Sequence, residues 1–92
     1  MLRIQIEERC QLLTIRLQGR LAGPWVAELD RCWQSTLAAA GDKTVDVVLE
    51  AVTYVDGPGE LLLWEMHQGG ARLHGYGLHS RHLVDQIHKR AG

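Results

Sequence analysis

The sequence has little cysteine and no long apolar run, and both absences narrow its possible functions. Among its 92 residues only two are cysteines, Cys10 and Cys32. They are too few and too far apart for a disulfide framework or a Cys-x-x-Cys site, so we expect reduced thiols without a chemical role. No stretch approaches the roughly 20 apolar residues of a membrane span, and the first residues alternate where a signal peptide would be continuous. We therefore expect a cytoplasmic protein that is not inserted into a membrane.

An excess of charge of one sign is also missing. The chain has 10 Lys and Arg against 11 Asp and Glu, for a net charge of -1, and no basic cluster stands out. Nucleic acids and anionic membranes bind concentrated positive charge, so neither is favoured as a partner. The length fits one domain, residues 1–92, and is too short for a second core or a deep substrate cavity.

The first half of the chain predicts a hairpin and a helix. Apolar and polar residues alternate over 2–6 and 13–17, which is typical of strands with one buried face, and residues 8–11 link them. Residues 19–23 are expected to form a connection to a helix opened by Pro24. The apolar stripe of this helix consists of Val26, Leu29, Trp33, Leu37 and Ala40.

The second half predicts two further strands and two helices. Residues 44–49 are short and β-branched, as in an interior strand, and Asp46 must point to an edge or to a partner. A helix beginning at Gly57-Pro58 is expected to stop at residues 69–70, before a last strand over 71–75. Ser80 is expected to cap a final helix. Its inward residues would be Leu83, Val84 and Ile87.

This order, ββαβαβα, predicts a single small α/β domain. Strand–helix–strand units imply parallel pairing, whereas the hairpin is antiparallel, so we expect a four-stranded mixed sheet with three helices.

The turn after Asp56 is the strongest candidate site. Pro58 fits the first helical position and Gly57 the N-cap, which places Glu60 three residues later in capping-box position. The first amides of this helix could accept an anion or a hydroxyl group. In sheets of this kind sites lie beyond the carboxyl ends of strands, where this turn is expected. The alternative is that Asp56 and Gly57 only cap a core helix.

Three segments carry a family resemblance. They are Leu17-Gln-Gly-Arg-Leu21, Val45-Asp-Val-Val-Leu49, and Val52-Thr-Tyr-Val-Asp-Gly-Pro-Gly59 followed by a Leu-rich helix. In order and spacing they resemble the STAS domain of anti-sigma factor antagonists and of the cytoplasmic tails of sulfate transporters. The resemblance runs from about Leu12 to Ile87. It implies a STAS-like fold and a non-enzymatic, bacterial protein–protein interaction module with a regulatory role.

The resemblance also implies that a switch is missing. In the family, the residue after the Asp is usually a Ser or Thr that a partner kinase phosphorylates, and here Gly57 holds that place. We therefore expect a variant without phosphorylation at this position. The nearby hydroxyl of Thr53 is expected to serve the loop instead.

By the same resemblance, the partner-binding surface is the turn and the exposed side of its helix. It comprises Asp56, Gly57, Pro58, Gly59, Glu60, Leu61 and Trp64. Trp64 fits either an interface anchor or a peripheral core residue that folds over the sheet edge.

Three functions remain open at this level. In the first, the chain regulates an anti-sigma factor or another kinase-like signalling protein. In the second, it is a small accessory subunit that binds the ATPase of an ABC-type lipid transport system. The third possibility is a module that binds a nucleotide or another anion at the helix start. The oligomeric state is open as well.

Catalysis and metal binding have less support. Carboxylates cluster near the strand ends, but no positioned nucleophile or base accompanies them, so we do not expect an enzyme. The chain has five histidines, and His82, Asp85 and His88 recur at steps of three, yet they match no recognised ligand signature. We expect neither a metal nor a cofactor.

Overall fold

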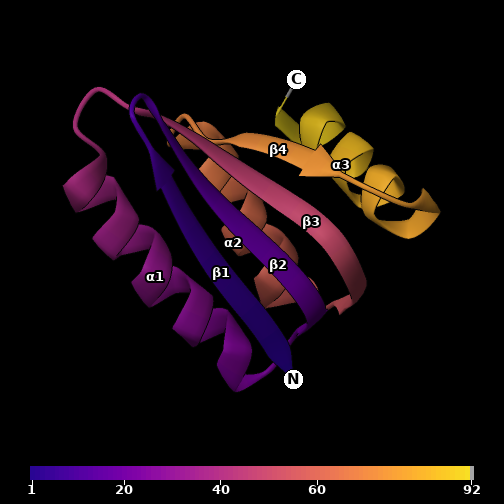
Figure 1. The fold of residues 1–92 in the computed structure, drawn as a ribbon. Coiled ribbons are helices and arrows are strands. Elements are labelled where there is room, and N and C mark those ends of the chain that lie inside the picture. Colours follow the sequence, from indigo (N-terminus) through magenta and orange to yellow (C-terminus); the bar gives the residue numbers. More distant parts are fainter. Residues whose placement is uncertain (92) are drawn as a thin grey trace.

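Strands and helices alternate along the chain in the predicted order ββαβαβα (Figure 1). The computed structural model describes residues 1–91, so Gly92, the last residue of the predicted domain, lies outside the described residues. The strands are β1 (Leu2–Arg9), β2 (Leu12–Leu21), β3 (Thr44–Val55) and β4 (Arg72–Gly75). The helices are α1 (Pro24–Ala40), α2 (Gly57–Gln68) and α3 (Leu78–Ala91).

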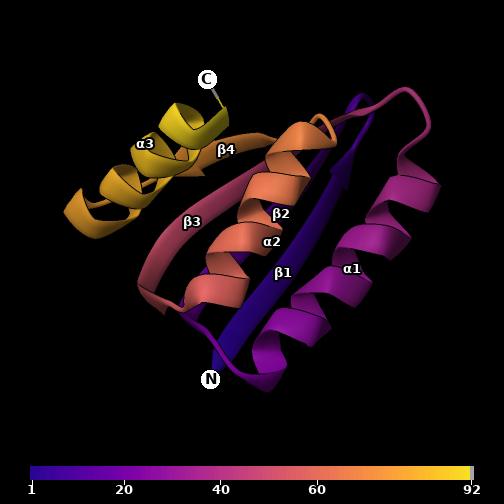
Figure 2. The same ribbon diagram turned by 180° about the vertical axis from the view of Figure 1, so that it is seen from behind.

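The sheet is mixed, as predicted, with the strand order β1-β2-β3-β4. The hairpin strands β1 and β2 are antiparallel, whereas β3 is parallel to both of its neighbours. The crossovers through α1 and α2 proceed in the same direction across the sheet, and right-handed crossovers of that kind place both helices on one face. Figure 2 shows α1 and α2 side by side over that face, with α3 beyond them along β4.

The core lies between this helical layer and the sheet. The alternating residues of the two central strands that face the helices are buried, as are the residues of α1 and α2 that meet them. The fully buried members of this core are Ile15, Leu17, Leu21, Leu29, Val47, Leu49, Leu63, Met66 and Ile87.

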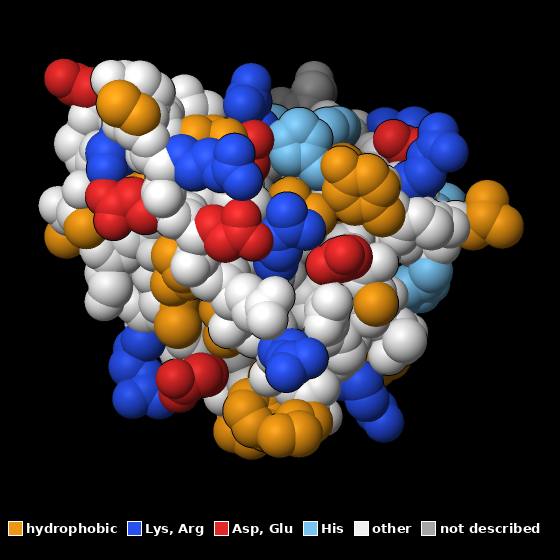
Figure 3. Space-filling view, in the orientation of Figure 1, with side chains coloured by type: hydrophobic (Ala, Val, Ile, Leu, Met, Phe, Trp, Pro, Cys, Tyr) orange, Lys and Arg blue, Asp and Glu red, His pale blue; other side chains and the backbone are white. Residues whose placement is uncertain are grey.

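The opposite face of the sheet has no helix over β1, β2 and β3 in the described part of the chain, and carries charges of both signs (Figures 1 and 3). Arg16 lies 3.0 Å from a carboxylate oxygen of Glu7 and 3.7 Å from one of Glu50. Arg72 donates two hydrogen bonds, of 2.7 and 3.1 Å, to Asp46, and this carboxylate raises the pKa of Arg72. Asp46 thus meets partners, as predicted, and opposite charges offset each other across the face.

Both central strands are longer than predicted. The residues from Gly19 to Leu21, expected in a connection, continue β2, and β3 runs on to Val55. The parallel register shifts between Leu17 and Gln18 and again between Gly19 and Arg20. Such irregularities interrupt the two-residue alternation from which the end of a strand is read in the sequence.

Two helical predictions were wrong in detail. Ser80 does not cap α3, which begins at Leu78; it is buried in the first turn, against the backbone of Gly75. In α1, Leu37 is 40% exposed and Thr36 is buried in its place. The Thr36 hydroxyl donates to the backbone carbonyl of Cys32, so its polar group is satisfied inside the protein.

Adjacent residues of β2 should differ sharply in their contribution to stability. Leu17→Ala removes a fully buried side chain from the sheet centre and should lower the free energy of unfolding by about 2–5 kcal/mol. Arg16→Ala removes solvent-exposed ion pairs and should cost less than about 1 kcal/mol. Urea denaturation of both variants checks this, and comparable losses would contradict the assignment of the two faces.

Candidate functional site

Asp56 is the N-cap of α2. It follows the last residue of β3 and has an extended backbone, and its Oδ1 accepts a hydrogen bond of 2.8 Å from the Gly59 amide. The prediction of Gly57 as N-cap was therefore wrong by one residue, since an Asp side chain satisfies a helix amide and glycine has none to offer. Consequently Glu60 is four residues past the cap and outside capping-box position, which corrects its predicted role.

The same carboxylate also binds the start of α1. Oδ2 of Asp56 accepts a hydrogen bond of 3.0 Å from the amide of Gly23, the N-cap residue of α1. No side chain caps α1 in the way that Asp56 caps α2. One negative charge thus lies at the N-termini of two helices, where both macrodipoles favour it.

Two glycines of the turn differ in their surroundings. A Cβ at Gly59 would lie 2.7 Å from the backbone oxygen of Leu21 and 3.0 Å from Oδ1 of Asp56, so only glycine lets α2 approach the end of β2 this closely. A Cβ at Gly57 would meet nothing within 4 Å. Gly59 is therefore a packing position, whereas Gly57 is an open surface position.

The start of α2 offers little to a free anion. Pro58 has no amide hydrogen, the Gly59 amide is bonded to Oδ1 of Asp56, and the Glu60 amide donates to the Asp56 backbone oxygen. The Asp56 carboxylate already occupies the place of an anion and would repel another one. This geometry disfavours the nucleotide or anion-binding function.

The remaining predicted site residues lie on the outer side of α2, at different depths. Pro58 and Leu61 are exposed, the latter at 46%, and Glu60 is half-buried. Trp64 is half-buried and packs against the core, and its Nε1 has no hydrogen-bond partner among residues 1–89, whose side chains the structure describes. Leu61 is thus available to a partner, whereas much of the Trp64 side chain is taken up by contact with the core.

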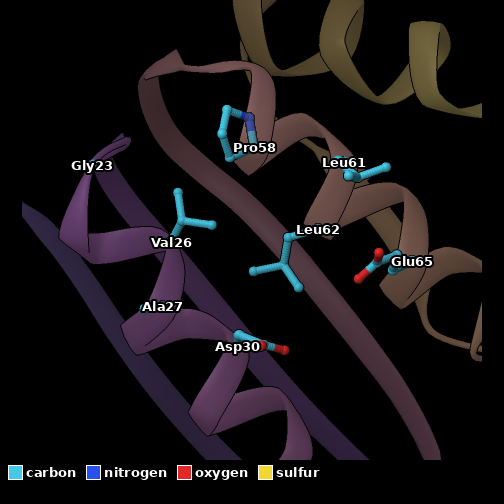
Figure 4. Close-up of a pocket in the computed structure, with 8 residues that line it drawn as sticks. All are labelled: Gly23, Val26, Ala27, Asp30, Pro58, Leu61, Leu62 and Glu65. Atoms are coloured by element: carbon cyan, nitrogen blue, oxygen red, sulfur yellow. The ribbon is translucent and has the colours of Figure 1, made fainter.

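A groove of about 350 Å³ runs between α1 and α2 beside this turn (Figure 4). Pro58 and Leu61 are the predicted residues that line it. Sequence reasoning missed its other lining residues, which are Gly23, Val26, Ala27, Asp30, Leu62 and Glu65. One signal was available: both helices begin at Gly-Pro, directly after neighbouring parallel strands, so both start at the same edge of the sheet.

Other candidates from the sequence lie elsewhere. The Thr53 hydroxyl donates to the backbone oxygen of Gly19 at 3.3 Å, between β3 and β2. Within residues 1–91, no three His, Cys, Asp or Glu side chains are grouped so as to hold a metal ion. The described helices include none with the length and apolar character needed to cross a membrane.

Known proteins resemble this chain in structure but not in sequence. No protein-family model matches the sequence, and no curated protein matches it at the sequence level. The structure, however, superimposes with a TM-score of 0.83 on an anti-sigma factor antagonist from Mycobacterium paratuberculosis, at 12% identity, over 99% of this chain and 81% of that one. A protein of the DUF3478 family from Shewanella loihica, described as having a SpoIIAA-like fold, matches with a TM-score of 0.57 and 16% identity, over 84% of this chain and 68% of that one.

The fold is SpoIIAA-like, of the STAS type. A further match, to Mglu, has a TM-score of 0.62 and 19% identity; it covers 80% of this chain and only 19% of the other. A SpoIIAA-like fold thus accounts for nearly all of the described chain, as the sequence resemblance implied.

Asp56→Asn should destabilise the protein although the side chain keeps its shape. One carboxylate oxygen becomes an NH₂ group, which would face either the Gly23 or the Gly59 amide, so a donor meets a donor. We expect a loss of about 1–3 kcal/mol in the free energy of unfolding, measured by urea denaturation. Glu60→Gln is the control, since its side chain makes no hydrogen bond with residues 1–89, whose side chains are described. Equal losses in both variants would refute the double cap.

Gly59→Ala and Gly57→Ala form a second matched pair. At Gly59 the added methyl group must displace the backbone of Leu21, which we expect to cost about 1–3 kcal/mol of stability. At Gly57 the methyl group projects into open space and should leave stability within about 0.5 kcal/mol. Thermal or chemical denaturation measures both, and a tolerant Gly59 would contradict the close approach of α2 to β2.

Proposed function

We propose that this chain is a non-enzymatic protein-interaction module of the anti-sigma factor antagonist type. The observation that carries the proposal is the superposition on the mycobacterial anti-sigma factor antagonist, which extends over 99% of this chain. The proposed binding surface is the Asp56–Trp64 turn and helix, with Pro58 and Leu61 as its exposed apolar residues. The proposed partner is a cytoplasmic anti-sigma factor or another kinase-like protein.

In this proposal the module binds without a phosphorylation switch at position 57. Gly57 is exposed and has open space around its Cα, as a modifiable surface residue would, but it has no hydroxyl group. Charge therefore cannot be added there by a kinase. The amount of each protein, or competition for the same surface, would then set how much complex forms.

The hydrogen bonds at the start of α2 support a role in binding. Asp56 fixes the first turn through Gly59 and ties it to α1 through Gly23, so the exposed residues after it are held in place before any partner arrives. A preorganised surface loses less conformational entropy on association, which improves affinity without additional contacts.

The test is affinity capture from the native host with the wild-type chain and two variants. Leu61→Glu places a charge in the proposed surface and should reduce capture of a specific partner at least tenfold, whereas Leu37→Glu, on the far end of α1, should not. The two leucines have similar exposure, 46% and 40%, so the pair is matched.

Identification of the captured protein decides the partner class. A kinase-like or sigma-associated protein agrees with the proposal, and the ATPase of a lipid transporter would replace it with the accessory-subunit function. Equal capture by wild type and Leu61→Glu would show that this surface is not the binding site.

A further inference from the structure

The groove between α1 and α2 combines an apolar floor with acidic walls. Val26, Pro58 and Leu62 supply apolar surface close to the two helix starts that Asp56 bonds. Farther along, Asp30 of α1 and Glu65 of α2 both direct their carboxylates toward the gap between the helices (Figure 4). No Lys or Arg is among its lining residues within the described part of the chain.

The two helices that form the groove are much more acidic than the rest of the chain. Together α1 and α2 carry four carboxylates and one arginine, a net charge of -3, whereas the whole chain has a net charge of -1. The single arginine, Arg31, is engaged with Glu28 at 2.6 Å. Asp30 accepts a long hydrogen bond of 3.4 Å from Gln34. Among residues 1–89, whose side chains the structure describes, Glu65 has no ion-pair partner. The groove carboxylates therefore lack the neutralising partners that carboxylates on the open sheet face have.

We propose that this groove binds a partner protein through one apolar side chain that is followed, about one helical turn later, by an Arg or Lys. The apolar side chain would contact the floor formed by Val26, Pro58 and Leu62, and the cation would lie between Asp30 and Glu65. This inference rests on the proposed function and specifies the chemistry of the partner. The acidic walls disfavour anionic ligands and anionic membranes as occupants.

The dimensions agree with a side-chain site. At about 350 Å³ the groove is near the lower end of the range for small-molecule pockets, so it accepts one or two side chains and not an entire helix. Arg suits the far end particularly, because a planar guanidinium can bond two carboxylates at once.

The test is a selection from a displayed library of random peptides on the immobilised wild-type protein. The enriched peptides should share an apolar residue with Arg or Lys three or four positions away. A synthetic peptide of the enriched sequence is then titrated by fluorescence anisotropy. Glu65→Gln should weaken its binding at least threefold, and raising the salt concentration should weaken binding to wild type.

Glu28→Gln is the matched control, because it changes the net charge by the same amount but lies outside the groove, beside Arg31. It should leave peptide affinity within twofold of wild type. Enriched peptides without basic residues, the absence of any enriched peptide, or equal effects of the two variants would overturn the groove proposal. If capture of the host partner depends on Leu61 but not on Glu65, the groove proposal fails while the proposed function stands.

Discussion

The structure depends on a single carboxylate that accepts hydrogen bonds from two helix starts. Asp56 lies at the end of β3, bonds the Gly59 amide of α2 at 2.8 Å and the Gly23 amide of α1 at 3.0 Å, and so fixes how far apart the two helices begin. Its own amide donates to the Leu21 carbonyl, which extends the β2–β3 pairing to the last residue before the helix. Hydrogen bonds to one carboxylate therefore hold the two helix starts together at the mouth of the groove.

This arrangement explains why neighbouring glycines of the turn have different roles. Gly59 lies where α2 touches the backbone of β2, so a larger residue there would displace that backbone and cost stability. Gly57 contributes nothing to the double cap, which uses only the Asp56 carboxylate and backbone amides. A change of residue at position 57 can thus remove a hydroxyl group without altering the geometry around it.

The order of elements and the mixed sheet were predictable because the local signals agree with one another. Alternation marked the hairpin, and the two Gly-Pro pairs marked helix starts. The ends of β2 and β3 were not predictable, since register shifts beside Gly19 break the alternation without leaving a mark of their own. Of the site, the sequence indicated the turn and Leu61, but not Asp30 or Glu65. Those two meet only through the packing of α1 beside α2, and helix patterns reveal which face is buried and not which neighbour it meets.

The proposed absence of a phosphorylation switch at position 57 affects the charge at the acidic groove. A phosphate at position 57 would add negative charge beside Asp56, at the mouth of a groove whose walls already carry Asp30 and Glu65. In a relative with the same acidic groove, phosphorylation would strengthen the attraction of a basic partner segment, whereas a partner that inserts its own carboxylate near the helix start would be repelled. Without a phosphorylatable residue at position 57, only the fixed charges act at this turn, so its attraction for a basic segment would be constant at a given salt concentration. The carboxylates that attract a cation would also repel acidic segments of other proteins. Charge beside a small apolar site would thus contribute more to specificity than to affinity.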